Sequence, residues 1–326
     1  MLKFFTRIVL LAGAMCAGTV AYGQDYPSRP VRIIVGFPAG GSMDIVARIL
    51  GEKLSAQMGQ PFVVENRPGA IGSIALNSMM TMSPDGYTLL LGTNTQIQRT
   101  TTVENNPYRM LEPVALTGTI PVALLANPKR AASTLPELIE KARNANPSLT
   151  FATPGQGSPM LFAMEMLQQR AKLKLLHVPY NGGPPAVNDA AAGHVNMVAV
   201  GLPTALGLVR GNVLKPLAVL QESRTALLPD TPTVREAIGV GGIDFVVWMA
   251  LFAPPKTPAD IVKRLEAETE TALADKNVQS KFFEAALDAR FAKGAALADL
   301  MASQIRLSLE VLNSMSDAEN RDQGKK

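Results

Sequence analysis

Two glycine-rich segments hold the residues whose types and spacing could do chemistry. Residues 37–42 read Phe-Pro-Ala-Gly-Gly-Ser, and residues 153–158 read Thr-Pro-Gly-Gln-Gly-Ser. Each segment follows a β-branched run and precedes a helical pattern, so each is expected to be a loop that opens a helix. Unpaired backbone N–H groups and the positive end of the helix dipole favour an anion at such a loop. The alternative is an ordinary strand-to-helix turn, in which glycine only gives the tight geometry.

The residues expected to bind a ligand come from these two segments and from two further places. The Thr153 and Ser158 hydroxyls can donate hydrogen bonds, and the neighbouring glycines let the backbone approach a ligand. Thr93 and Asn94 follow a strand at its carboxyl end, where parallel sheets bind ligands. The Tyr180 ring can close over a ligand while its hydroxyl donates. The full set is Phe37, Pro38, Ala39, Gly40, Gly41, Ser42, Thr93, Asn94, Thr153, Gly155, Gly157, Ser158 and Tyr180.

Charged residues near these segments have mainly structural explanations. Asp44 either holds the first loop by accepting backbone N–H bonds or meets a ligand amine. Asp189 lies where it can orient Tyr180. Arg67 and Glu65 belong to a proline turn that they are expected to tie down. Since neither glycine-rich segment contains lysine or arginine, a carboxylate would be held by backbone amides, hydroxyls and water, and an uncharged amide could replace it.

Motifs of the common enzyme classes are missing. The sequence has no G-x-S-x-G, no G-x-x-x-x-G-K-[ST], and no G-x-G-x-x-G between a strand and a helix. Proline follows Ser158, which removes the backbone N–H that an oxyanion hole of that type would use. His177 and His194 have no metal-ligand spacing, and His177 is expected to be a hydrogen-bonded core histidine of a buried strand. We therefore expect no catalytic residue, no cofactor and no metal site.

The first 23 residues have the features of a secretory signal peptide. Lys3 and Arg7 form a basic start, residues 8–20 are apolar, and small residues precede a cleavage point near Gly23. An uncleaved anchor is the alternative. The sole cysteine, Cys16, lies inside this segment, so the mature chain would contain no thiol. An exported chain without disulfides is typical of the bacterial periplasm.

Charge and aromatic content argue against a nucleic-acid partner. Loss of Lys3 and Arg7 lowers the formal net charge from +4 to +2. No basic run exceeds Lys325-Lys326, and aromatic residues make up 5% of the chain, too few for base-stacking platforms.

The coarse pattern is strand, loop and helix in repetition. This alternation predicts an α/β fold with mainly parallel sheets flanked by helices. Helix starts are expected at Thr134, with a capping box to Glu137, and at the Thr-Pro pairs of residues 231–232 and 257–258. Short buried strands are expected at residues 31–35, 62–65, 88–91, 122–125, 149–152, 175–178, 197–200 and 217–220.

Seven motifs, in order along nearly the whole mature chain, resemble the Bug family, the periplasmic receptors of tripartite tricarboxylate transporters. They are residues 26–35, 37–41, 64–69, 84–92, 177–182, 228–234 and 248–254. The resemblance implies a two-lobed periplasmic binding protein with two crossover segments that closes on a small organic anion in a cleft between the lobes. Family ligands include di- and tricarboxylates, acidic amino acids, aromatic acids and some uncharged amides. The chain departs from the family pattern at Met43 and Gly183, so the ligand stays open.

With the resemblance, the crossings are expected near residues 117–121 and 245–254. Lobe 1 would then comprise residues 24–120 and 248–326, and lobe 2 residues 121–247. The expected function is a monomeric periplasmic receptor that delivers a small organic acid to membrane transporter subunits. The alternatives are a ligand-sensing domain that signals to a membrane kinase and, less favoured, an exported hydrolase.

Overall fold

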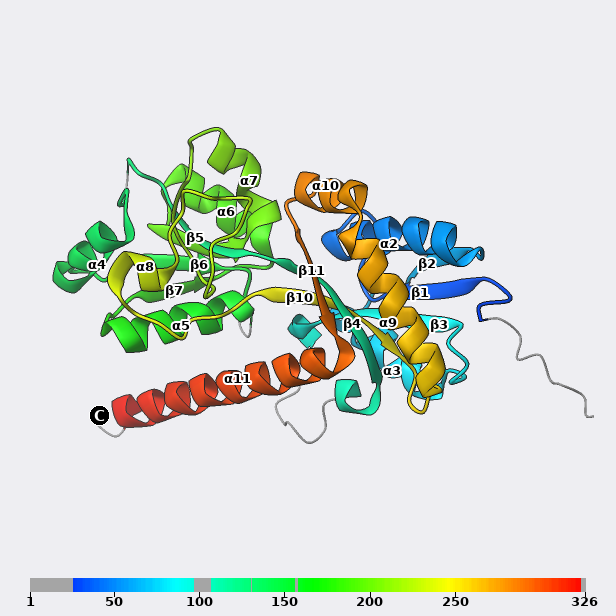
Figure 1. The fold of residues 1–326 in the computed structure, drawn as a ribbon. Helices are drawn as coiled ribbons and strands as arrows, with labels where there is room; N and C mark the ends of the chain where they lie inside the picture. The colour runs from blue at the N-terminus through cyan, green and yellow to red at the C-terminus, as the bar shows by residue number, and fades with distance from the viewer. Residues whose placement is uncertain (1–25, 97–106, 130, 156–157, 324–326) are drawn as a thin grey trace, which may run out of the picture.

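The computed structural model describes residues 26–96, 107–129, 131–155 and 158–323, and it contains two β-sheets joined by extended strands (Figure 1). The first sheet has the strand order β11-β4-β10-β3-β1-β2, and the second has the order β7-β6-β8-β5-β9. The strands of the first sheet are β1 (Val31–Val35), β2 (Phe62–Asn66), β3 (Thr88–Thr93), β4 (Glu112–Ile120), β10 (Val247–Ala253) and β11 (Asp288–Lys293). Those of the second are β5 (Val122–Ala126), β6 (Thr150–Thr153), β7 (Leu176–Pro179), β8 (Met197–Gly201) and β9 (Lys215–Val219).

Both sheets are mixed, which corrects the expectation of mainly parallel ones. Strands β2, β1 and β3 are parallel, as are β7, β6 and β8. The remaining pairs, which involve β4, β5, β9, β10 and β11, are antiparallel. The reason is that the chain passes between the sheets on β4–β5 and returns on β10, and these strands run against their neighbours.

Helices cover both faces of each sheet. On the first sheet α2 (Ser42–Met58), α9 (Ala259–Ala274) and α10 (Lys276–Glu284) lie opposite α3 (Ser73–Ser78) and α11 (Gly294–Gln323). On the second sheet α4 (Leu135–Asn144), α5 (Pro159–Ala171) and α8 (Val234–Ile238) lie opposite α6 (Gly183–Ala192) and α7 (Leu202–Arg210). Short 3-10 turns include η2 (Ala70–Gly72), η3 (Met79–Thr81), η4 (Asn94–Gln96) and η5 (Pro107–Met110). Within the described ranges, no helix combines the length and apolar character that a membrane span needs.

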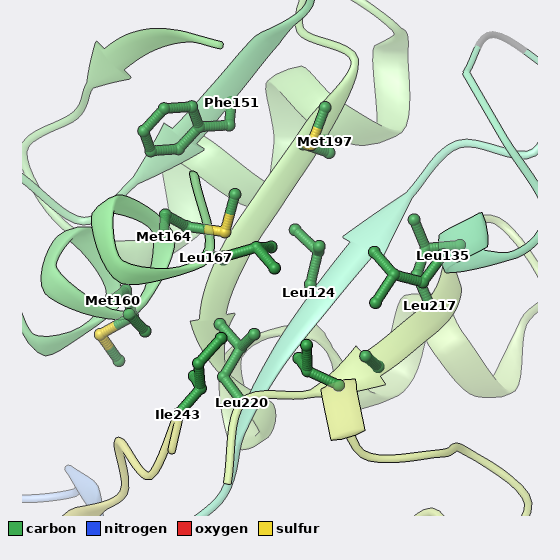
Figure 2. Close-up of a cluster of buried hydrophobic side chains, with 14 of the residues drawn as sticks. Leu124, Leu135, Phe151, Met160, Met164, Leu167, Met197, Leu217, Leu220 and Ile243 are labelled. Atoms are coloured by element: carbon green, nitrogen blue, oxygen red, sulfur yellow. The ribbon is translucent and has the colours of Figure 1, made fainter. Parts of the chain in front are cut away.

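The core of the second sheet shows why its helices dock (Figure 2). Leu124 and Met197 project from neighbouring strands toward Met164 and Leu167 of α5, and all four side chains are fully buried. Burial of each such side chain contributes about 1.5–3 kcal/mol. This packing holds α5 against the face of the second sheet.

A third connection joins the two halves. Helix α11 starts beside β4 and runs along the molecule to lie next to α5, as Figure 1 shows. Leu307 of α11 packs against the core of the second sheet. The prediction placed the last helices on the first lobe alone, so the reach of α11 differs from it. The first sheet contains β1–β4, β10 and β11, and the second contains β5–β9. This division agrees with the predicted lobe boundaries, which remain a prediction.

Candidate functional site

The first glycine-rich loop is held from behind by Asp44. The Gly40 N–H and the Arg48 Nε–H both donate to Asp44 Oδ2 at 2.9 Å. Asn66 Nδ2 donates to Asp44 Oδ1 at 2.9 Å and to the Phe37 carbonyl at 3.1 Å. The sequence allowed Asp44 either to hold the loop or to meet a ligand amine, and these contacts show that it holds the loop. Asn66 was not among the predicted residues, although its place at the carboxyl end of β2, beside β1, was a usable signal.

The Asp44 contacts make stability pH-dependent at low pH. The hydrogen bond from Arg48, together with those from Gly40 and Asn66, lowers the pKa of this buried carboxyl to about 2. Its ordinary value is 3.8. A carboxyl with a lowered pKa stabilises the fold fully above its unfolded pKa, and the contribution is lost as the pH falls through the folded value. The difference corresponds to about 2 kcal/mol.

We therefore expect Asp44→Asn to flatten the fall in unfolding free energy between about pH 4 and pH 2. Urea unfolding at a series of pH values measures this. The control is Asp260→Asn, which changes an exposed carboxylate in the first turn of α9. An acid limb as steep in Asp44→Asn as in the control would contradict the assignment.

The start of α2 presents uncapped backbone donors. Gly41 is the N-cap residue and has no side-chain oxygen to accept the first N–H groups of the helix. Gly40 has φ +82°, a conformation in which any side chain would be strained. Residues 38–41 are exposed, so an anion can reach these N–H groups from solvent.

The second glycine-rich segment, before α5, can bind a ligand through a side-chain hydroxyl rather than through free backbone N–H groups at the helix start. Ser158 is the N-cap of α5, and its Oγ accepts from Leu161 N at 3.2 Å, which leaves its own proton free to donate outward. Thr153 is fully buried, and its Oγ1 lies 2.8 Å from His177 Nε2 and accepts from Gly155 N at 3.3 Å. Gly157, also predicted, lies outside the described residues.

His177 is a site neighbour that the sequence misplaced. The prediction put it in a buried strand, but β7 is an edge strand and His177 is half-buried. Its ring stacks on Phe151 with centroids 4.9 Å apart, and partial burial lowers its pKa. It is therefore neutral near pH 7. A neutral imidazole can accept from the Thr153 hydroxyl or donate to it, depending on the tautomer.

Tyr180 is oriented as expected but differs in one respect. Its hydroxyl donates to Asp189 Oδ2 at 2.6 Å, and its backbone N–H donates to the Thr153 carbonyl at 3.1 Å. Burial, and then the carboxylate of Asp189, raise the pKa of Tyr180 to about 12. Because the proton points at Asp189, the hydroxyl can accept a hydrogen bond from a ligand but does not donate one. This corrects the predicted donor role.

The end of β3 is tied to the second crossover. Asn94 Nδ2 donates to the Val246 carbonyl at 2.7 Å and to Gln304 Oε1 of α11 at 2.9 Å. Trp248 Nε1 donates to the same Gln304 oxygen at 2.8 Å. The Asn94 amide is thus committed to joining three parts of the chain. By contrast, Thr95 Oγ1 is buried without a hydrogen-bond partner among the described residues.

The charged turn behind the first loop is structural, as predicted. Arg67 Nε lies 2.7 Å from Glu65 Oε1, and Arg67 N donates to the Val35 carbonyl. Arg48 pairs with Asp44. The guanidinium groups of Arg48 and Arg67 are therefore both paired with a carboxylate.

Comparison with known proteins places the chain in a family. The profile of the tripartite tricarboxylate transporter family receptor, TctC, matches residues 46–315. The chain belongs to the TctC receptor family. It is 34% identical to protein BugT of Bordetella pertussis over 281 residues, which cover 84% of this chain and 85% of BugT. The predicted family and the predicted two-sheet periplasmic binding fold are both confirmed.

Solved TctC-family structures share the fold closely. A solute-binding protein from Polaromonas, solved without ligand, has a TM-score of 0.79 and 25% identity, covering 89% of this chain and 99% of that one. A Rhodopseudomonas palustris protein solved with adipate has a TM-score of 0.74 and 28% identity, covering 89% and 98%. MatC of the same species, solved with malate, has a TM-score of 0.69 and 29% identity, covering 88% and 99%.

The family consists of periplasmic solute receptors rather than enzymes, which confirms that part of the prediction. In this TctC-family chain, the candidate residues gather at the carboxyl ends of parallel strands. The first loop follows β1, Thr93 ends β3, Thr153 ends β6 and Tyr180 follows β7. In Figure 1, α2 begins at its end nearer the second sheet, and α5 begins at its end nearer the first. The predicted signal peptide lies outside the described residues.

Proposed function

We propose that this receptor binds a small organic carboxylate between the carboxyl edges of its two sheets and delivers it to a membrane transporter. The observation that carries the proposal is the start of α2. There a loop fixed by Asp44 presents uncapped, exposed N–H groups, and no described cation is free beside it. The adipate and malate complexes of related proteins support a dicarboxylate as the ligand class.

In the proposed site, each of the two sheets supplies part of the contacts to the ligand. The α2 start binds one carboxylate through backbone N–H groups, which are charge-assisted donors worth about 1.5–3 kcal/mol each. The Ser158 hydroxyl supplies a donor from the second half. The N-terminus of α6 contributes little, because residues 184 and 185 are both proline and have no N–H. Tyr180 covers the ligand from the β7 side.

Domain closure follows from this division. Full contact with the ligand exists only when both loops reach it, so the ligand favours the closed state by the difference in contacts. The crossings at β4–β5 and β10 are the proposed hinge.

The proposal is tested by calorimetry with adipate and malate on purified variants. Removal of one donor to a carboxylate costs about 1.5–3 kcal/mol, so Ser158→Ala should weaken binding about tenfold or more. Thr153 is fully buried and its hydroxyl bonds His177 and Gly155, so Thr153→Val should weaken binding less, through loss of the contacts that position the backbone at Gly155. Arg67→Gln should leave the affinity unchanged and lower only the melting temperature. A thermal melt of each variant is needed, because Ser158→Ala also removes a helix cap worth about 1 kcal/mol.

Two outcomes would contradict the mechanism. One is loss of binding confined to Arg67→Gln with an unchanged melting temperature, which would indicate a salt bridge. The other is full affinity in Ser158→Ala. Failure of every small acid and amide tested to bind the wild-type protein would contradict the proposed ligand class itself.

A further inference from the structure

A cavity lies away from the β6 and β7 loops, between α11 and the segment that leads into β4. Its volume is about 360 Å³, within the range of small-ligand pockets. The lining residues are Tyr108, Arg109, Leu111, Pro113, Ala298, Met301, Ala302, Ile305 and Arg306. None of them belongs to the glycine-rich loops or to β6 and β7.

The cavity exists because α11 presents small side chains at this point. Ala298 and Ala302 are four residues apart, so they lie on the same face of the helix, one turn apart. Their methyl groups leave space that Tyr108 and Leu111, both buried, do not fill from the other side. The floor of the cavity is therefore apolar.

The charged residues among the described lining of the cavity are two arginines. Arg306 lies one turn after Ala302, and Arg109 contributes a second guanidinium from η5. Arg306 is exposed and enters none of the ion pairs formed between described residues. None of the described lining residues is acidic. An apolar floor beside the Arg306 guanidinium complements a molecule that has an apolar body and one anionic head.

We propose that this cavity binds an amphipathic monocarboxylate, with its hydrocarbon part against Tyr108, Met301 and Ile305 and its carboxylate on Arg306. This ligand differs in chemistry from the one proposed for the first site. There a carboxylate meets backbone N–H groups and hydroxyls, whereas here it meets a guanidinium beside an apolar surface.

The test uses octanoate, whose eight-carbon chain suits the apolar floor and which stays monomeric at millimolar concentration. Binding to the full chain is measured by calorimetry and by saturation-transfer NMR. Ala302→Leu fills the cavity from an exposed helix position with a residue that favours helix, so the fold should be retained. Arg306→Gln removes the charge, and Arg306→Lys keeps it. Thr153→Val is the matched control for the first site.

We expect Ala302→Leu to weaken octanoate binding at least tenfold and Arg306→Gln to weaken it about fivefold, with partial recovery in Arg306→Lys. Thr153→Val should have no effect, and octan-1-ol should bind more weakly than octanoate. The proposal is overturned if octanoate does not bind at millimolar concentration or if Ala302→Leu binds like the wild type. It is also overturned if Thr153→Val abolishes binding, since octanoate would then occupy the first site.

Discussion

Replacement of Gly36 by alanine is expected to lower both the stability of the receptor and its affinity for a carboxylate. Gly36 lies between β1 and the first loop, and a Cβ there would lie 2.6 Å from Gly72 Cα and 3.0 Å from the Gly72 carbonyl oxygen. These are backbone atoms that cannot rotate away. Overpacking of this kind costs about 1–3 kcal/mol. Relief requires the end of β1 to move, and the loop that presents the N–H groups moves with it.

Urea unfolding and calorimetry with adipate or malate measure the two effects. We expect at least a tenfold loss of affinity, because displaced donors no longer converge on one carboxylate. Gly207→Ala is the control, since Gly207 is exposed in α7 and a Cβ there meets nothing within 4 Å. That variant should be more stable by about 0.5–1 kcal/mol and should bind normally. Normal binding by Gly36→Ala would show that the first loop does not hold the ligand.

Gln304→Met is expected to cause a large loss in the free energy of unfolding. The Gln304 oxygen accepts from both Asn94 Nδ2 and Trp248 Nε1, and Gln304 is 5% exposed. Methionine has a similar length but cannot replace this acceptor, so two buried donors each lose a partner. A buried donor without a partner costs about 1–3 kcal/mol, so the loss should be roughly 2–4 kcal/mol.

Gln57→Met is the matched control for this substitution. Gln57 donates to Glu268 at a half-buried position, so a loss of about 1 kcal/mol or less is expected. Chemical denaturation of the two variants measures the difference. Equal losses in the two would mean that the Gln304 contacts do not stabilise the junction of β3, β10 and α11.

The parts of the fold that local patterns encode were predicted well. The eight expected strands all occur, with small differences at their ends, because short apolar runs between turn residues identify strands whichever way they pair. The helix after Thr134 also begins as expected, with Glu137 N donating to the Thr134 hydroxyl. The glycine-rich loops lie at strand ends for the same reason.

The parts that depend on distant contacts were not predicted. Strands β4 and β10 pair with one another across more than a hundred residues, and the sequence alone suggested only crossings there. The helix expected at the Thr-Pro pair of residues 231–232 starts later, because Thr233 forms the capping box with Glu236. The Asn94–Gln304 bond joins residues 210 positions apart, so the sequence, which predicts Asn94 as a ligand residue, gives no sign of this structural contact.

Trp248 is the only tryptophan in the chain, and it sits at the start of the second crossover. Its indole is fully buried, its N–H is bonded to α11, and its ring meets Tyr108 edge-on with centroids 5.8 Å apart. The emission of an indole depends on the polarity and hydrogen bonding around it. The receptor therefore carries its own fluorophore at the proposed pivot, and bending of the chain there should be visible in the emission spectrum without any attached dye.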